Sequence, residues 1–324
     1  MIYEKIKLAK YKFVITPKED LELPPYKGST LRGGFGSTFR KISCIDRNKS
    51  SCKGCLLKDK CAYSYIFDTS PRSDSEVLKN LDDIPRPFII EPPLDTKTIF
   101  NKDQSLDFNL ILIGQAIDYL PYFVVTFKEL GNEGIGKGRK KFILTQIITT
   151  SILNPDETLI YNSGDDVIKN LESRFTWADI IANSISGTRK FKPKYITLNF
   201  LTPTRIKHQD EFVSLPDFHV VIRALLRRIA NLAYFHCGEN LGIDFNFFIR
   251  QATKIKIEEL KVRWVDWERY SFAQRRRMRL GGFVGEVTYK GELEPFLPFL
   301  LLGEHTHLGK GATFGMGWYR MMIK

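Results

Sequence analysis

A short glycine-lysine motif occurs twice in this chain, and it constrains the fold more than any other feature. A hydrophobic residue followed by Gly-Lys-Gly opens both IGKGRKKFIL (135–144) and LGKGATFGMG (308–317). In each half of the chain the motif follows an apolar helical stretch and precedes a final strand-like run. Repetition of a whole supersecondary pattern indicates duplication. We therefore expect two copies of one kind of domain.

The hydrophobic periodicity of each half predicts the order strand, helix, strand, strand, helix, strand. Helices are expected at residues 29–42, 116–130, 217–237 and 293–302. The first of these has Leu31, Phe35, Phe39 and Ile42 on one stripe. The order is that of a ferredoxin-like unit. The predicted fold class is α+β, with two tandem ferredoxin-like (RRM-shaped) domains that each end in a glycine-rich loop and a final strand.

The same pattern sets the expected domain boundaries. The N-terminal domain is predicted at residues 1–150, with a cysteine-bearing insertion at 44–68. The C-terminal domain is predicted at residues 191–324. Residues 151–190 are polar and mixed, so they are predicted to be a linker with a small hairpin.

The balance of charge predicts a polyanionic partner. The chain has 49 lysines and arginines against 37 aspartates and glutamates, for a formal net charge of +12. Nucleic acid is favoured over a membrane because no basic amphipathic helix stands out. No apolar run approaches about 20 residues, and the N-terminus lacks a signal-peptide core. We expect a cytoplasmic protein with no membrane partner; on charge alone, a merely basic protein stays an alternative.

Four cysteines, Cys44, Cys52, Cys55 and Cys61, are close together in the predicted insertion. In a cytoplasmic protein such a group indicates a metal rather than disulfides. The central C-x2-C spacing is typical of tetrahedral zinc, whereas the irregular outer spacings leave an iron–sulfur cluster open. We predict a structural zinc ion; free thiols in a loop are the alternative. Cys237 is expected in the core.

Four segments of the chain resemble the CRISPR-associated RAMP endoribonucleases that cut repeat RNA. They are GSTLRGGFGSTFRK (28–41), IGKGRKKF (135–142), LNFLTPTRIK (198–207) and the C-terminal stretch 281–321. The resemblance implies tandem ferredoxin-like domains, binding of CRISPR repeat RNA, and metal-independent cleavage that supplies guide RNA to an effector complex. Subunits of that complex are thus implied partners.

One departure from the family affects the chemistry. Many members carry a catalytic histidine on the first helix, but the first histidine here is His208. Metal-free cleavage uses the 2′-hydroxyl of the RNA as nucleophile and needs a base, an acid and cations near the phosphate. We predict that His307, or else His305, lies in the scissile pocket with Lys310, and that no cofactor takes part. The alternative for both histidines is that they hold the loop's shape.

Further residues are predicted to bind RNA. Tyr270 is a further candidate catalytic residue, which could stack on a base or orient a phosphate; the alternative is that it anchors its hairpin. The basic candidates are clustered on the first helix, at the first glycine loop and in the run QRRRMR. The predicted RNA-binding residues are Arg32, Arg40, Lys137, Arg139, Lys140, Arg275, Arg276, Arg277, Arg279, Gly309 and Gly311. The glycines Gly33, Gly34 and Gly36 of the first helix indicate close approach, either of RNA or of packed protein.

Three functions are consistent with these patterns. The first is an endoribonuclease that cleaves repeat RNA to a 2′,3′-cyclic phosphate and a 5′-hydroxyl. The second is a non-catalytic RAMP subunit that binds guide RNA in an effector complex, which the missing first-helix histidine favours. The third is a basic RNA-binding protein without a CRISPR role. The two complete glycine loops favour the first.

Overall fold

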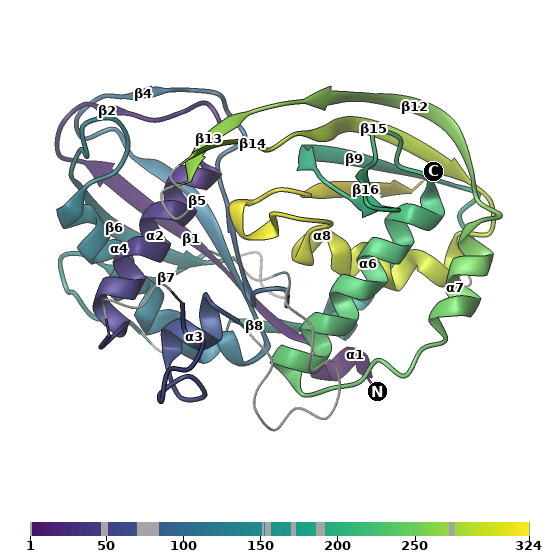
Figure 1. The fold of residues 1–324 in the computed structure, drawn as a ribbon, viewed down its shortest axis with the longest axis horizontal. Helices are drawn as coiled ribbons and strands as arrows, with labels where there is room; N and C mark the ends of the chain where they lie inside the picture. The colour runs from purple at the N-terminus through teal and green to yellow at the C-terminus, as the bar shows by residue number, and fades with distance from the viewer. Residues whose placement is uncertain are drawn as a thin grey trace. The chain divides into compact units, whose positions relative to one another are not determined.

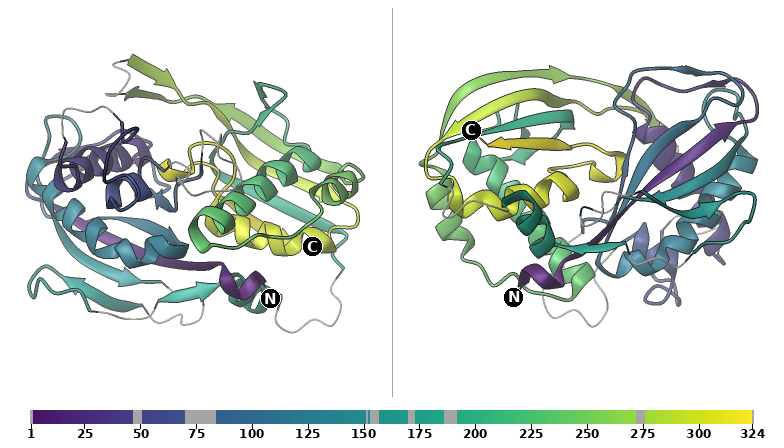
Figure 2. Two further views of the ribbon diagram at one scale, coloured as in Figure 1. Left: turned by 60° about the horizontal axis from the view of Figure 1, so that its bottom comes forward. Right: turned by 180° about the vertical axis from the view of Figure 1, so that it is seen from behind.

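The structure is a computed structural model of the chain. It describes residues 2–46, 51–69, 84–150, 152, 157–169, 173–185, 192–271 and 276–323, and for residues 185, 268–271 and 276–279 the backbone alone. The chain forms two compact units. We call residues 5–175 and 231–239 the N-terminal unit, and residues 1–4, 176–230 and 240–324 the C-terminal unit (Figure 1 and Figure 2).

The N-terminal unit contains one sheet of the order β3-β5-β1-β6-β7, with β8 paired to β1. The described pairs of β1 with β5 and β6 are antiparallel. The elements are β1 (Lys7–Pro17), β2 (Leu21–Glu22), α2 (Gly28–Ser43), α3 (Ala62–Ile66), β3 (Phe88–Glu91), β4 (Ile99–Phe100), β5 (Leu106–Ile113), the 3-10 helix η1 (Gly114–Tyr119), α4 (Leu120–Glu133), β6 (Phe142–Thr149), β7 (Thr158–Asn162) and β8 (Arg174–Thr176). The order of β3, β5, β1 and β6 is the ferredoxin-like order.

Phenylalanines hold the two helices of this unit against its sheet. The rings of Phe35 on α2 and Phe123 on α4 are stacked, with centroids 4.7 Å apart. Phe127 of α4 contacts Phe13 of β1, with ring centroids 5.4 Å apart. Phe35 and Phe39 are fully buried, as the predicted stripe requires, whereas Ile42 at its end is 41% exposed.

The stretch predicted as a linker contains regular structure. Of its residues, 158–162 form β7, which pairs with β6, and 174–176 form β8, which pairs with β1. Residues 177–185 form helix α5 (Trp177–Ile185). Strand pairing over long sequence separation cannot be read from local periodicity, which explains the difference from the prediction.

The predicted helix at residues 217–237 changes form near its end. Helix α6 (Phe218–Leu232) is followed by a π-helical turn, η2 (Ala233–Cys237). Within the N-terminal unit His236 is fully buried. Its Nε2 donates to the carbonyl of Pro85 at 2.7 Å, and its Nδ1 lies 3.3 Å from the hydroxyl of Tyr65.

The C-terminal unit repeats the ferredoxin-like order in the sheet β12-β15-β9-β16. Its elements are α1 (Ile2–Lys5), α5, β9 (Tyr195–Thr204), β10 (Lys207–His208), β11 (Glu211–Phe212), α6, α7 (Phe245–Ala252), β12 (Lys256–Val265), β13 (Glu268–Ser271), β14 (Arg276–Arg279), β15 (Gly282–Lys290), the 3-10 helices η3 (Glu294–Phe296) and η4 (Ala312–Phe314), α8 (Leu297–Thr306) and β16 (Tyr319–Ile323). Buried Tyr319 of β16 donates its hydroxyl to the carbonyl of Leu300 on α8 at 2.6 Å.

The fold predicted from the sequence is confirmed: an α+β chain with two ferredoxin-like sheets in tandem. The glycine-rich loop precedes the last strand of the ferredoxin-like order in both units, β6 and β16. None of the described helices is both long and apolar enough to cross a bilayer.

Candidate nucleic-acid interface

Residues 307–318, which we call the C-terminal loop, connect α8 to β16 and have a fixed shape. The N–H of Lys310 donates to the carbonyl of Arg205 at 2.8 Å. The Thr202 hydroxyl donates to the carbonyl of Gly315 at 2.7 Å. The lysine side chain is exposed at the tip of this loop. The loop therefore presents a cation on a backbone anchored to the end of β9.

Gly309 makes this anchoring sterically feasible. Its φ is +78°, a conformation that L side chains rarely adopt. A Cβ at this position would lie 2.4 Å from the carbonyl oxygen of Arg205. A side chain at residue 309 would thus move the neighbouring Lys310 away from β9.

His307 lies beneath the loop rather than in a pocket. Its side chain is fully buried, and its Nδ1 donates to the carbonyl of Met316 at 3.1 Å. The ring is parallel to that of Trp318, with centroids 5.9 Å apart. We predicted that His307 lies in the scissile pocket. Its position matches the alternative instead, because a buried ring that bonds the loop holds the loop's shape.

The backbone of His307 is also unusual. Its φ is +59° and its ψ is 174°, a region that is populated almost only by glycine and costs about 1–3 kcal/mol for other residues. The protein holds this strain at the point where α8 ends and the loop begins. His305, two residues earlier on α8, is half-buried.

A second cation lies at the base of the C-terminal loop. The guanidinium carbon of Arg205 is 3.7 Å from the centroid of the Phe212 ring, an aromatic residue on β11. Burial lowers the pKa of Arg205, while the charge of Asp266 acts in the opposite direction. Arginine keeps its charge despite such shifts, so Arg205 adds a positive charge next to Lys310.

Two further histidines of the C-terminal unit lie next to each other, on elements that follow β9 in the chain. The ring centroids of His208 on β10 and His219 on α6 are 6.0 Å apart. Neither Arg205 nor these histidines was a predicted site residue.

The equivalent loop of the N-terminal unit, residues 134–141, is neutralised by carboxylates. Lys137 pairs with Glu22 at 3.1 Å, and Lys140 pairs with Glu19 at 2.8 Å. The Lys140 hydrogen bond, with that of the Lys141 amide, lowers the pKa of Glu19. Arg139 is exposed and has a φ of +51°. These three predicted RNA-binding cations thus share a loop, and two of them are paired.

The predicted cations of the first helix lie over aromatic rings. The guanidinium carbon of Arg32 is 4.0 Å from the centroid of the Phe67 ring, and that of Arg40 is 5.9 Å from Tyr63. A Cβ at Gly36 would meet Phe67 at 2.0 Å. Of the two readings for these glycines, protein packing accounts for Gly36, since Phe67 fills that space.

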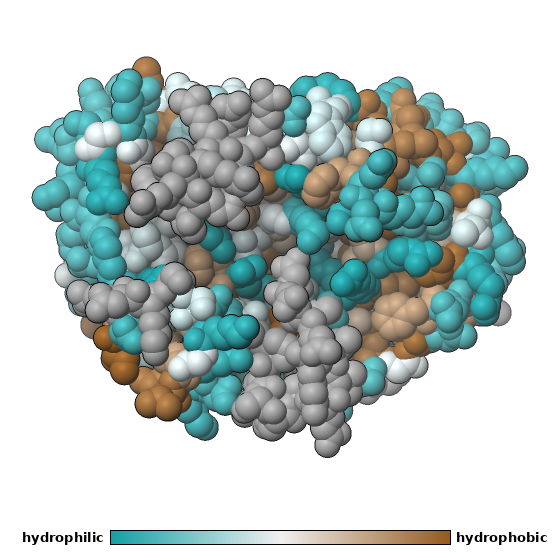
Figure 3. All heavy atoms as spheres, viewed as in Figure 1, coloured by the Kyte–Doolittle hydropathy of each residue, from teal (hydrophilic) through white to brown (hydrophobic). Residues whose placement is uncertain are grey.

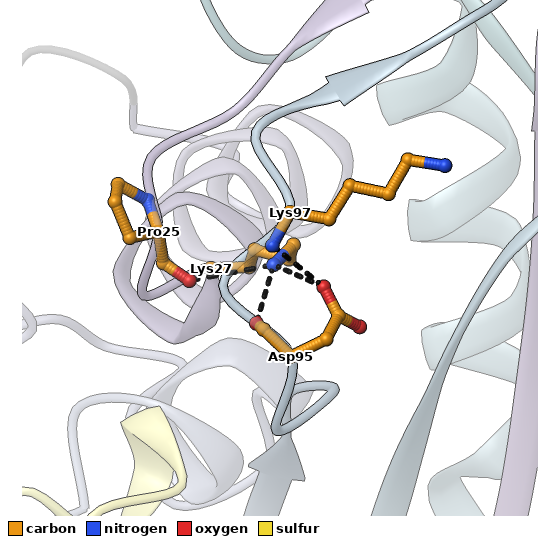
Figure 4. A network of polar contacts seen from close by, with 4 residues as sticks. All are labelled: Pro25, Lys27, Asp95 and Lys97. Atoms are coloured by element: carbon orange, nitrogen blue, oxygen red, sulfur yellow. Dashed lines mark hydrogen bonds and ion pairs between the residues drawn. The ribbon is translucent and has the colours of Figure 1, made fainter.

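A buried lysine fixes the start of α2 (Figure 4). Lys27 is fully buried, and its Nζ donates to the carbonyl oxygen of Asp95 at 2.9 Å and to its carboxylate at 3.1 Å. Partial burial acts to raise the pKa of Asp95, but hydrogen bonds from Lys27 and from the Lys97 amide lower it. Burial also raises the pKa of Tyr26 well above its usual range. Lys27 is therefore a structural cation.

The basic hairpin of the C-terminal unit is described by its backbone. Strands β13 and β14 are antiparallel, with Tyr270 opposite Arg277, so the predicted hairpin is present. Arg275 and the side chains of Tyr270, Arg276, Arg277 and Arg279 lie outside the described residues, and their roles stay predictions.

The predicted metal site has no support from the described residues. No group of three or more histidine, cysteine or acidic residues among them is arranged to hold a metal ion. The thiol of Cys44 donates to the carbonyl of Asp46. Burial, with a hydrogen bond to Asp68, raises the pKa of Cys52 to about 12. A structural zinc ion stays a prediction from the cysteine spacing.

These cysteines belong to an apolar region of the N-terminal unit. Leu56 is fully exposed, and Ile45 is 78% exposed. Figure 3 shows hydrophobic surface at the lower left, where Figure 1 shows α3 and the loop before it. Two exposed lysines, Lys53 and Lys60, lie among these apolar residues in the sequence.

Two family models match the chain. Residues 6–173, slightly more than half of the chain, match AF_1859_N, described as an N-terminal domain. Residues 198–319 match the model of CRISPR-associated endoribonuclease Cas6. An uncharacterised protein of Archaeoglobus fulgidus is 26% identical over 314 residues, which are 92% of each chain.

Solved structures share the fold. A Thermus thermophilus Cas6 in a product complex has a TM-score of 0.58 and 14% identity, over 97% of this chain and 100% of that chain. A chain of a partial Cas6-RT-Cas1–Cas2 complex has a TM-score of 0.56 and 13% identity, over 100% of this chain and 47% of that one. At these identities the likeness concerns the fold.

Proposed function

We propose that this chain, which belongs to the AF_1859_N family and to the CRISPR-associated endoribonucleases of the RAMP superfamily, cleaves repeat RNA. The cleavage needs no metal ion. The nucleophile is the 2′-hydroxyl next to the scissile phosphate. The products carry a 2′,3′-cyclic phosphate and a 5′-hydroxyl and serve as guide RNAs. A cytoplasmic location, and Cas proteins such as effector-complex subunits as further partners, belong to the same proposal.

The observation that carries this proposal is the exposed Lys310 on a rigid loop, with Arg205 at the loop's base. The Lys310 N–H is anchored at 2.8 Å to the carbonyl of Arg205, so the backbones of these two cationic residues are held together. Preorganised cations stabilise the negative charge that develops on a phosphorane. Lys310 contacts the scissile phosphate, and Gly309 and Gly311 let the backbone approach it.

The remaining predicted residues have supporting roles in this scheme. His307 positions the loop from below, because its ring is buried and bonded to Met316. His305 stays a candidate for proton transfer. The hairpin arginines and Tyr270 bind the RNA outside the scissile position.

A substrate with one missing hydroxyl tests the mechanism. Repeat RNA with a single 2′-deoxy nucleotide before the scissile phosphate should bind but not be cleaved, and unmodified RNA should be cleaved in EDTA. Binding of both RNAs without cleavage of either would instead favour the non-catalytic guide-RNA subunit. Loss of cleavage in EDTA while the protein stays folded would contradict the metal-free mechanism.

A further inference from the structure

Two of the five histidines of the chain form a pair in the C-terminal unit. His208 lies on β10, and His219 lies in the first turn of α6. Their ring centroids are 6.0 Å apart and their planes are inclined by 83°. Both side chains are half-buried. The rings are therefore adjacent, are not stacked, and remain accessible from solvent.

One member of the pair, His208, lies on the same short segment as Arg205, the cation at the base of the C-terminal loop. Strands β10 and β11 pair His208 with Glu211 and Lys207 with Phe212. The ring of Phe212 carries the Arg205 guanidinium, and the carbonyl of Arg205 accepts from Lys310. A chain of direct contacts thus links the hairpin that carries His208 to the loop that carries Lys310.

A basic stripe on α6 leads to the pair. His219, Arg223 and Arg227 follow each other at intervals of four residues and so share one helix face. Both arginines are exposed, and neither pairs with a carboxylate in the part of the chain that the structure describes. Figure 3 shows hydrophilic side chains along α6, which lies in front of its sheet in Figure 1. The stripe offers phosphate contacts on an RNA backbone.

Nearby carboxylates only partly neutralise this group. Asp210 pairs with Lys207 at 2.7 Å. The negative charge of Asp266 raises the pKa of Arg205, against the effect of burial. Glu211 lies opposite His208 in the β10–β11 pair, and Asp217 directly precedes α6. Arg205 and the two exposed α6 arginines supply positive charge on the segments that carry the pair.

We propose that His208 and His219 are the general base and general acid of RNA cleavage, a role that rests on the proposed endoribonuclease function. Imidazole is the side chain suited to both roles near neutral pH. At a centroid separation of 6.0 Å, one phosphate group can lie within hydrogen-bond reach of both rings. The pair also provides the proton-transfer groups for which the first helix of this chain has no histidine.

The proton balance of this step is complete. One imidazole takes the proton of the 2′-hydroxyl as its oxygen forms a bond to phosphorus. The bond from phosphorus to the 5′-oxygen breaks, and the other, protonated imidazole gives its proton to that oxygen. Lys310 stabilises the charge on the phosphorane, and exchange with water restores both imidazoles.

Single-turnover cleavage of repeat RNA in EDTA by His208→Ala and His219→Ala tests the pair. Each variant should be slower by roughly 100-fold or more, with RNA binding changed by about threefold or less, because the lost group acts in the transition state. Lys207→Ala, which removes an exposed neighbour of His208, is the matched control and should cleave at close to the wild-type rate.

A substrate with sulfur in place of the bridging 5′-oxygen separates catalysis from a structural role. A thiolate leaves without a proton, so the variant that lacks the acid should regain cleavage on this RNA, while the variant that lacks the base should not. Equal slowing of both variants on both substrates would overturn the proposal, as would wild-type rates in both variants. If the wild-type protein itself does not cleave the RNA in EDTA, that result contradicts the proposed metal-free endoribonuclease function and not the specific assignment of His208 and His219.

Discussion

The glycine-lysine loops of the two units have one backbone design and opposite electrostatics. In both, the lysine N–H donates to a carbonyl just beyond the first strand of the sheet: Lys137 to Glu22 at 3.1 Å and Lys310 to Arg205 at 2.8 Å. The residue that supplies this carbonyl is acidic in the N-terminal unit and basic in the C-terminal unit. The loop itself is therefore a structural device, and its neighbours decide whether it can hold phosphate.

The residue that ends the preceding helix differs as well. It is Gly134 in the N-terminal unit, with φ +84° and ψ 158°, and His307 in the C-terminal unit, with φ +59° and ψ 174°. The same backbone conformation is thus unstrained in one unit and strained in the other. The strained residue contributes a buried ring that fastens the loop to Trp318, which indicates that rigidity matters most at the C-terminal loop.

The largest expected difference between the two loops appears in the cleavage rate when the central lysine of each loop is replaced by alanine. Lys310→Ala should slow single-turnover cleavage of repeat RNA by about 100-fold or more, since one stabilising donor is typically worth that factor, and should also weaken binding. Lys137→Ala is the matched variant and should change the rate by about threefold or less. Equal losses in the two variants would show that the charged neighbours do not make the two loops functionally different.

The second-largest effect is expected from removing the basic cluster of each unit, because the two clusters should contribute unequally to RNA binding. Replacing Arg275, Arg276 and Arg277 with alanine should weaken binding roughly tenfold or more and reduce the salt dependence of affinity, because fewer counterions are released. The same change at Lys137, Arg139 and Lys140 should have a smaller effect, since two of those lysines are paired with Glu22 and Glu19. Binding measured over a series of salt concentrations checks both, and an unchanged slope in the first variant would place the hairpin away from RNA.

Substitutions at His307 sharpen the contrast with Gly134. His307→Ala should lower thermal stability and RNA binding together, because it removes the buried ring and keeps the strained backbone. His307→Gly should be more stable than His307→Ala by about 1–2 kcal/mol, since glycine adopts this conformation freely. Thermal unfolding of both variants provides the measurement, and a greater stability of the alanine variant would disprove the strain.

The smallest effect on cleavage is expected from the cysteines, all five of which lie in the N-terminal unit. Their spacing predicts about one zinc ion per chain. Changing Cys52 and Cys55 to serine should remove it and lower the stability of this unit, with little change in cleavage. Cys237→Ser serves as the control and should keep the metal. If metal analysis finds iron, the cysteines hold an iron–sulfur cluster instead of zinc. If the wild-type protein contains no metal, the cysteines are free thiols in a loop.

Local periodicity and the repeated motif were sufficient to predict the fold. The stripe of Leu31, Phe35 and Phe39 defined α2, and those residues are fully buried. Pro121 lies in the first turn of α4, as its lack of an N–H requires. Strands β7 and β8 were missed because their partners are distant in sequence and their own pattern is weak.

The candidate site was only partly predictable. The sequence located the C-terminal loop and Lys310, but nothing local to His307 distinguishes a buried ring from an exposed one. The ion pair of Lys137 depends on Glu22, which is far away in the chain. The pairing of His208 with His219 depends on the β10–β11 hairpin, whose strands of two residues each have no detectable period.

The π-helical turn after α6 determines when the N-terminal unit can be completed during synthesis. His236, which is buried against Tyr65 and Pro85, belongs to that unit but follows α6, most of which belongs to the C-terminal unit, along the chain. A ribosome that adds residues from the N-terminus has therefore released the N-terminal sheet well before the segment that covers this part of it. The N-terminal unit can therefore make its full set of contacts only after residues 231–239 have been synthesised, when part of the C-terminal unit is already present.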